Sequence, residues 1–120
     1  AGQSRTAGVP REDLVQEYLR CYRQPGAVHA ICEDYRAAAT IDLEHDAADA
    51  DRRIEAPLLA LWGARGVVGE LYDVLQTWRD KAANVRGRPL PCGHALQEER
   101  PEETAAALID FLGEEPVTPP

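Results

Sequence analysis

The stretch Pro57-Leu58-Leu59-Ala60-Leu61-Trp62-Gly63 decides how this chain folds. It is a continuous apolar run with no polar alternation, and a proline and a glycine bound it. Such a run predicts a strand that is buried on both faces, as in a parallel sheet. It is far shorter than the roughly 20 apolar residues that span a bilayer, so we expect no membrane role.

A second strand is predicted, more weakly, over residues 85–90, because Gly87 and Pro89 both disfavour a long strand. Between the strands, apolar residues recur at helical spacing and predict one amphipathic helix: Leu71, Val74, Leu75 and Trp78. A last helix is expected to begin at Pro101 and end at Gly113. Its apolar residues predict the buried face: Ala105, Leu108, Ile109 and Leu112.

The second half of the chain is therefore a strand–helix–strand crossover followed by a helix, which indicates an α/β fold. Two parallel strands cannot cover their own apolar faces and edges. We therefore expect partner strands from outside these residues, so that this chain forms part of a larger fold.

The first half of the chain is predicted to be helical. Leu14, Tyr18 and Tyr22 indicate one helix after Pro10, and Pro25-Gly26 should break it. A second apolar stripe follows at helical spacing: Val28, Ile31, Cys32, Tyr35 and Ala39. Residues 40–50 are expected to form a shorter helix or turn. This divides the chain into a disordered lead-in (1–9), a helical part (10–53), a strand-containing part (54–113) and a disordered tail (114–120).

Composition limits the classes of function. The 120 residues allow one domain at most, and the net charge of −8 disfavours a nucleic-acid partner. The polar residues 1–10 lack the apolar centre of a signal peptide. The three cysteines, an odd number without a Cys-x-x-Cys pair, predict buried, reduced thiols of a cytoplasmic protein.

No metal or cofactor site is expected. The acidic run from Asp42 to Asp51 resembles a calcium loop only superficially, because Ala47 and Arg53 stand where an EF-hand needs glycine and glutamate. The three histidines have no zinc-ligand spacing. Ser4 is the only serine, and no Gly-x-Ser-x-Gly elbow surrounds it, which disfavours a serine nucleophile within these residues.

His94 is the candidate catalytic residue. In Pro91-Cys92-Gly93-His94, the glycine allows the backbone to present a side chain at the end of the second strand. A neutral imidazole near pH 7 can take a proton from water or from a nucleophile. Taken alone, the residue is more simply interpreted as an ordinary loop histidine.

From about Val9 to Gly113 the chain resembles the haloacetate (fluoroacetate) dehalogenases of the α/β-hydrolase superfamily. The resemblance is carried by Glu33-Asp-Tyr-Arg-Ala37 within residues 25–39, by residues 41–46, by Trp62-Gly-Ala-Arg-Gly-Val-Val68, and by Pro91-Cys-Gly-His94 with residues 98–104. It implies the C-terminal part of an α/β-hydrolase fold. Residues 10–53 would then be the end of a helical cap, and residues 54–113 the last two core strands with their helices.

The resemblance also implies a mechanism. An aspartate displaces halide from the haloacetate and forms an ester, and His94 activates the water that hydrolyses this ester. Tyr35 matches a halide-pocket tyrosine whose hydroxyl would donate a hydrogen bond to the departing halide. Many α/β-hydrolases have Trp-Gly-x-x-Asp, but Gly66 stands at that position here. The acid that orients the histidine must therefore come from elsewhere.

The nucleophile, the substrate-binding arginines and the orienting acid would all belong to a missing N-terminal half. We therefore expect this chain alone to be inactive. The expected partners are that half and a small haloacid, and a homodimer of the full-length protein stays open. One alternative is an epoxide hydrolase or another α/β-hydrolase. Another, from a different class, is a non-catalytic helical protein that binds a partner through its apolar stripes.

Overall fold

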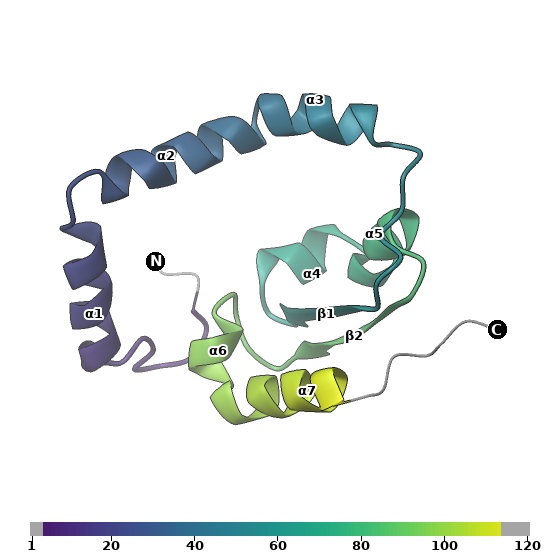
Figure 1. The fold of residues 1–120 in the computed structure, drawn as a ribbon. Coiled ribbons are helices and arrows are strands. Elements are labelled where there is room, and N and C mark those ends of the chain that lie inside the picture. Colours follow the sequence, from purple (N-terminus) through teal and green to yellow (C-terminus); the bar gives the residue numbers. More distant parts are fainter. Residues whose placement is uncertain (1–3, 114–120) are drawn as a thin grey trace. The chain divides into compact units, whose positions relative to one another are not determined.

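The computed structural model describes residues 4–113, which form two compact units (Figure 1). One unit is Pro10–Arg52, and the other combines the residues before Pro10 with those from Arg53 onward. The tail expected at 114–120 and the first three residues of the expected lead-in lie outside the described residues.

The unit Pro10–Arg52 is helical, with α1 (Glu12–Tyr22), α2 (Ala27–Ala38) and α3 (Ile41–Ala48) in succession. The break predicted at Pro25-Gly26 is confirmed. Gly26 precedes α2 with a φ of 81°, in the left-handed region that glycine adopts without strain. The stretch for which the sequence left a helix or a turn open forms the helix α3.

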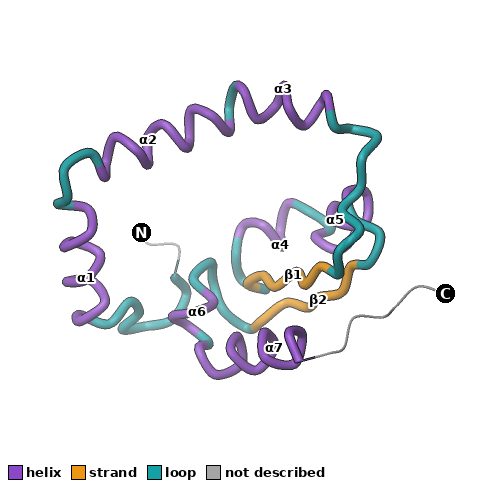
Figure 2. Tube along the Cα trace, viewed as in Figure 1, coloured by secondary structure: helices purple, strands orange, loops and turns teal. Residues whose placement is uncertain are grey.

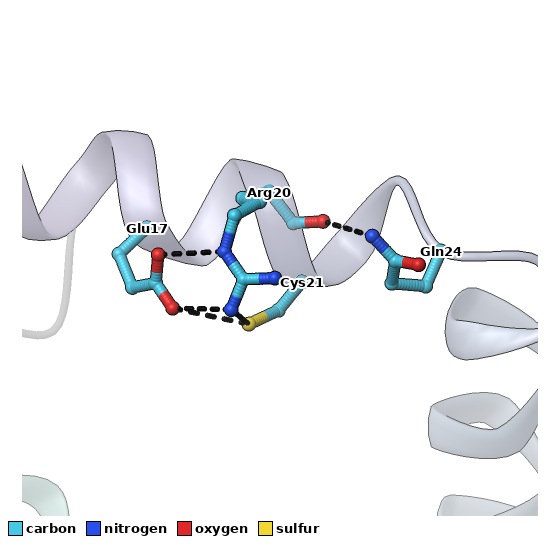
Figure 3. A network of polar contacts seen from close by, with 4 residues as sticks. All are labelled: Glu17, Arg20, Cys21 and Gln24. Carbon is cyan, nitrogen blue, oxygen red and sulfur yellow. Dashed lines mark hydrogen bonds and ion pairs between the residues drawn. The ribbon is translucent and has the colours of Figure 1, made fainter.

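Side-chain pairs along α1 reinforce its last turns (Figure 3). The Arg20 guanidinium donates to both carboxylate oxygens of Glu17, at 2.8 and 2.6 Å. The pKa of Glu17 is lowered because this hydrogen bond favours its charged form. Gln24 Nε2 then donates to the carbonyl oxygen of Arg20 at 3.2 Å, where the helix has ended.

No residue of α1, α2 or α3 is buried within the described structure. The apolar stripe predicted on α2 is present, but the exposed fractions of Val28 and Tyr35 are 58% and 75%. Helices of this length gain most of their stability from packing an apolar face against another surface. The stripe is therefore a face that nothing in its own unit covers.

The other unit contains a parallel sheet of β1 (Leu58–Gly63) and β2 (Val85–Leu90), drawn in orange in Figure 2. Both predicted strands are confirmed, and the fold class is α/β. Gly87 lies opposite Ala60, and a β-carbon on it would be 2.0 Å from the carbonyl oxygen of Ala60. Gly87, which disfavoured a strand in the sequence, is thus the residue that allows the backbones of β1 and β2 to approach each other closely. Pro89 is tolerated because, within residues 4–113, β2 pairs on one side only.

The single helix predicted between the strands is wrong, because the chain forms α4 (Val67–Leu71) and α5 (Val74–Lys81) instead. Tyr72 and Asp73 adopt extended backbone conformations between them. The Asp73 carboxylate accepts a hydrogen bond from the Gln76 amide at 3.0 Å and caps α5. An aspartate that caps a helix cannot also lie in its interior, so the apolar spacing runs across a helix boundary.

After β2 come α6 (Leu96–Glu99) and the predicted last helix, α7 (Pro101–Gly113). The face expected to be buried on α7 is instead exposed, with exposed fractions of 69% for Ile109 and 77% for Leu112. The partly buried residues of α7 are Glu103, Thr104, Ala107 and Phe111. The Arg86 guanidinium of β2 lies 4.7 Å from the Phe111 ring centroid. A sheet of two strands is too narrow to cover the whole apolar face of α7.

The core of this unit is small, and Leu90 and Cys92 are its largest fully buried side chains. We predicted residues 1–9 as a disordered lead-in. In the part that is described, the chain turns at Ala7-Gly8, and the Thr6 hydroxyl donates a hydrogen bond to the Glu99 carboxylate. Among the helices of residues 4–113, none is long and apolar enough to cross a membrane.

Candidate functional site

His94 lies in the loop that connects the carboxyl end of β2 to α6. Leu90 and Cys92, just before it, are completely buried, whereas His94 itself is exposed. In parallel sheets the loops at the carboxyl ends of the strands hold most ligand and catalytic sites. The structure therefore presents the predicted histidine at the edge of the sheet where such sites occur.

The loop carrying His94 is held against the end of β1. Backbone amides of the loop after β1 donate to carbonyl oxygens at and just after the end of β2, from Ala64 to Leu90 at 2.8 Å and from Arg65 to Cys92 at 2.9 Å. The Arg65 side chain also donates to the Pro91 carbonyl oxygen at 2.6 Å. These bonds fix the backbone just before Gly93, so His94 projects from an ordered loop.

Gly66 lies in the same place. It is buried, and a β-carbon on it would lie 3.6 Å from the carbonyl carbon of Gly93. The position at which many α/β-hydrolases carry an acidic residue thus adjoins the histidine loop, but in this chain it is Gly66, which has no side chain. No carboxylate at this position can orient His94.

A cavity of about 420 Å³ has His94 in its lining. Every residue of β1, from Leu58 to Gly63, lines this cavity. A cavity on one face of the sheet would be lined by every second residue only, because successive side chains of a strand point to opposite faces. The cavity therefore follows the edge of β1 that β2 leaves unpaired. The remaining lining residues are Gly66, Val68, Val74, Trp78, His94 and Leu96. Trp62 and Trp78 serve here as apolar wall.

Tyr35 belongs to the helical unit, and His94 belongs to the strand-containing unit. Within its own unit Tyr35 projects from α2 and is 75% exposed, so its hydroxyl is free of burial in the helical core. The simple alternative of a core tyrosine therefore does not hold within that unit. A surface brought against this face of α2 would meet both the ring and its hydroxyl.

The cysteines depart from expectation. All three are free, as predicted, but Cys21 and Cys32 are exposed, and only Cys92 is buried. Burial raises the pKa of the Cys92 thiol, and the nearby charge of Glu99 raises it further. Cys92 is therefore an apolar part of the core rather than a nucleophile. In residues 4–113 no group of three or more His, Cys, Asp or Glu side chains is arranged to hold a metal ion.

The sequence did not single out Glu99, which lies just before the last helix. It is buried, with 5% of its surface exposed, and its carboxylate accepts a hydrogen bond from the Gly93 amide at 3.0 Å. The signal available in the sequence was its place between a Gly-His pair and a helix-opening proline. That pattern reveals a helix start but not burial.

Comparison with known proteins gives the same architecture. A protein from Nostoc sp. described as a candidate alpha/beta hydrolase is 50% identical, superposes with a TM-score of 0.88, and is matched over 94% of this chain and 39% of its own. The chain has the fold of the C-terminal part of an α/β-hydrolase. A candidate acyltransferase from Salmonella enterica is 55% identical, with a TM-score of 0.86 over 92% of this chain and 36% of its own. No family model matches the chain.

Among curated proteins, a fluoroacetate dehalogenase from Burkholderia sp. is 36% identical over 113 residues, which are 94% of this chain and 37% of that protein. A candidate epoxide hydrolase from Pseudomonas aeruginosa is 35% identical, with a TM-score of 0.73 over 83% of this chain and 34% of its own. The chain thus spans little more than a third of the length of these relatives. The resemblance to the dehalogenases inferred from the residues is confirmed.

Proposed function

We propose that the protein containing this chain cleaves the carbon–halogen bond of haloacetates and that the chain supplies His94 and Tyr35 to the reaction. The observation that carries the proposal is the place of His94, exposed at the carboxyl end of β2 and lining a largely apolar cavity. The similarity to a fluoroacetate dehalogenase over 94% of the chain supports the substrate class.

The proposed reaction has two steps. A carboxylate from outside these residues attacks the α-carbon of the haloacetate, the carbon–halogen bond breaks, and an ester forms as halide leaves. The His94 imidazole then takes a proton from water as the water oxygen attacks the ester carbonyl. The proton passes to the departing alkoxide, so that the hydroxyacid is released and the carboxylate is regenerated. Tyr35 donates a hydrogen bond to the halide as negative charge develops on it. No step requires a cofactor.

The unpaired edge of β1 supports a partner segment. Its backbone groups and its apolar lining suit a further parallel strand, which would bring its own carboxyl end to the same edge of the sheet as His94. The exposed apolar residues of α7 offer a second surface for such a partner. We propose that the N-terminal half of an α/β-hydrolase covers both, and that this chain alone gives no turnover. The three unpaired cysteines support a cytoplasmic location.

The proposal is tested by halide release. The coding sequence upstream of Ala1 is determined, the full-length protein is expressed, and fluoroacetate and chloroacetate are each supplied as substrate. Continued halide release over many turnovers is the expected result for the wild type, and His94→Ala should limit it to about one equivalent per protein. Absence of halide release from both compounds would refute the proposal.

An epoxide hydrolase is the second candidate, favoured by the similarity to the Pseudomonas aeruginosa protein. It would share the histidine and the aspartyl ester. The two functions separate when an epoxide such as styrene oxide is supplied in parallel. Diol formation without halide release would favour the epoxide hydrolase.

A further inference from the structure

Glu99, the last residue of α6, is a buried carboxylate beneath the histidine loop. Among the described residues it is the buried charged side chain, with 5% of its surface exposed. Buried carboxylates are costly unless hydrogen bonds compensate for their lost hydration. The identity of its donors therefore indicates why the residue is buried at this position.

Three donors converge on one oxygen of Glu99. Oε2 accepts from the Gly93 amide at 3.0 Å, from the Thr6 hydroxyl at 2.7 Å and from the Arg5 amide at 3.0 Å. The other oxygen, Oε1, is buried and accepts no hydrogen bond within the described residues. One atom thus joins the loop just before His94 to a segment from the beginning of the chain.

The charge on Glu99 is kept by these bonds. Burial alone would raise the pKa of the carboxyl group, but the hydrogen bonds from Gly93, Thr6 and Arg5 outweigh it, so that the pKa is lowered. Hydrogen bonds to an ionised acceptor are shorter and stronger than those to a neutral one. At neutral pH a charged carboxylate therefore holds both the Gly93 loop and residues 5 and 6.

The histidine loop is confined from two sides. Gly63, at the end of β1, approaches the backbone of Gly93 so closely that a β-carbon would lie 1.7 Å from the Gly93 carbonyl oxygen. Glu99 holds the amide of the same residue. With its carbonyl against β1 and its amide on a carboxylate, the residue before His94 has little freedom to rotate.

We propose that Glu99 is a positioning residue that fixes the backbone of the His94 loop and fastens residues 5 and 6 to it. The part of this inference that concerns turnover rests on the proposed function, whereas the fastening itself does not. Residues 5 and 6 precede the helical unit, which begins at Pro10. Glu99 therefore links the chain that enters the helical unit to the loop that carries the histidine.

The single acceptor oxygen allows a sharp choice of variants. Glu99→Gln retains one carbonyl oxygen that can accept from the same donors, two at a time, but removes the charge. Glu99→Ala removes the acceptor and leaves the Gly93 and Arg5 amides without a partner. Glu102→Ala, at an exposed position in the first turn of α7, is the matched control.

Hydrogen–deuterium exchange of the full-length protein reads out the fastening without any substrate. In Glu99→Ala, exchange of the Gly93 and Arg5 amides should accelerate at least about tenfold, because each loses a bond to a charged acceptor. Exchange of the Leu58 amide, which bonds to the Asn84 carbonyl oxygen, should stay unchanged and report on global unfolding. Glu99→Gln should fall between the wild type and Glu99→Ala, and Glu102→Ala should match the wild type.

Equal acceleration at Gly93, Arg5 and Leu58 would reduce Glu99 to a general stabiliser and overturn the proposal, as would no acceleration at Gly93. With haloacetate as substrate, Glu99→Ala should lower kcat and leave KM unchanged, and Glu99→Gln should recover part of kcat. An unchanged kcat in Glu99→Ala, measured on an enzyme that releases halide, would also overturn it. If the wild type releases no halide, the proposed function fails, and the exchange result still decides the fastening.

Discussion

A β-carbon on Gly63 would lie 1.7 Å from the carbonyl oxygen of Gly93. The end of β1 and the loop after β2 are thus in backbone contact, which only a residue without a side chain permits. Gly63 belongs to the apolar run that specifies the strand, and Gly93 precedes His94. This contact therefore connects the fold-determining stretch directly to the candidate catalytic loop.

Gly63→Ala should destabilise the protein by about 2–3 kcal/mol, because the new methyl group must displace the Gly93 backbone. The midpoint of thermal or urea unfolding measures the loss. Gly113→Ala, where a β-carbon meets nothing within 4 Å, should leave the midpoint unchanged. Equal midpoints for the two variants would show that the backbone contact does not form.

Asp73→Ala should cost about 1 kcal/mol, because the Gln76 amide at the start of α5 loses its capping acceptor. Asp73→Asn retains a side-chain oxygen and should keep most of this stability. Urea unfolding of both variants measures the difference. Indistinguishable stabilities of Asp73→Ala and the wild type would mean that α5 does not depend on this cap.

The sequence predicted the strands, the last helix and the position of His94, because each depends on a local pattern. It failed where tertiary context decides. The periodic residues Leu71 and Val74 suggested one helix, but Asp73 between them caps the second of two. Leu112 was expected to be buried because it is apolar, yet 77% of its surface is exposed. Hydrophobicity identifies an apolar face but not the surface that covers it.

Glu99 could not be predicted as a buried residue, because two of its three donors come from residues 5 and 6, far away in the sequence. Its neighbours Glu98 and Pro101 indicated only a helix start. Tyr35, by contrast, was found only through the resemblance to a family. Its spacing with Val28 and Ile31 indicates a packing residue, whereas the structure leaves it 75% exposed.

The lowered pKa of Glu99 predicts how stability depends on pH. A carboxyl group whose folded pKa lies below its unfolded value contributes stability above the unfolded value, near 4.5, and loses it as the pH falls through the folded value. Wild-type unfolding midpoints should therefore decline more steeply below about pH 4.5 than those of Glu99→Gln. Parallel midpoint curves for the two proteins across this range would contradict the depressed pKa.

Tyr35→Phe should reduce halide release by roughly 100-fold if the hydroxyl donates to the departing halide, since removal of one such donor typically costs that much. Tyr22→Phe removes a hydroxyl from a 52% exposed tyrosine on α1 and should leave turnover unchanged. Steady-state halide release compares the variants. A similar rate for both would remove Tyr35 from the site.

Intact-protein mass spectrometry of the full-length His94→Ala variant, incubated with fluoroacetate, tests the central claim most directly. If His94 activates the water that hydrolyses the ester, the variant should release one equivalent of fluoride and accumulate a covalent adduct on a carboxylate. The wild type should turn over without a detectable adduct. Undiminished turnover by the variant, or no adduct and no fluoride from it beside an active wild type, would contradict the role of His94.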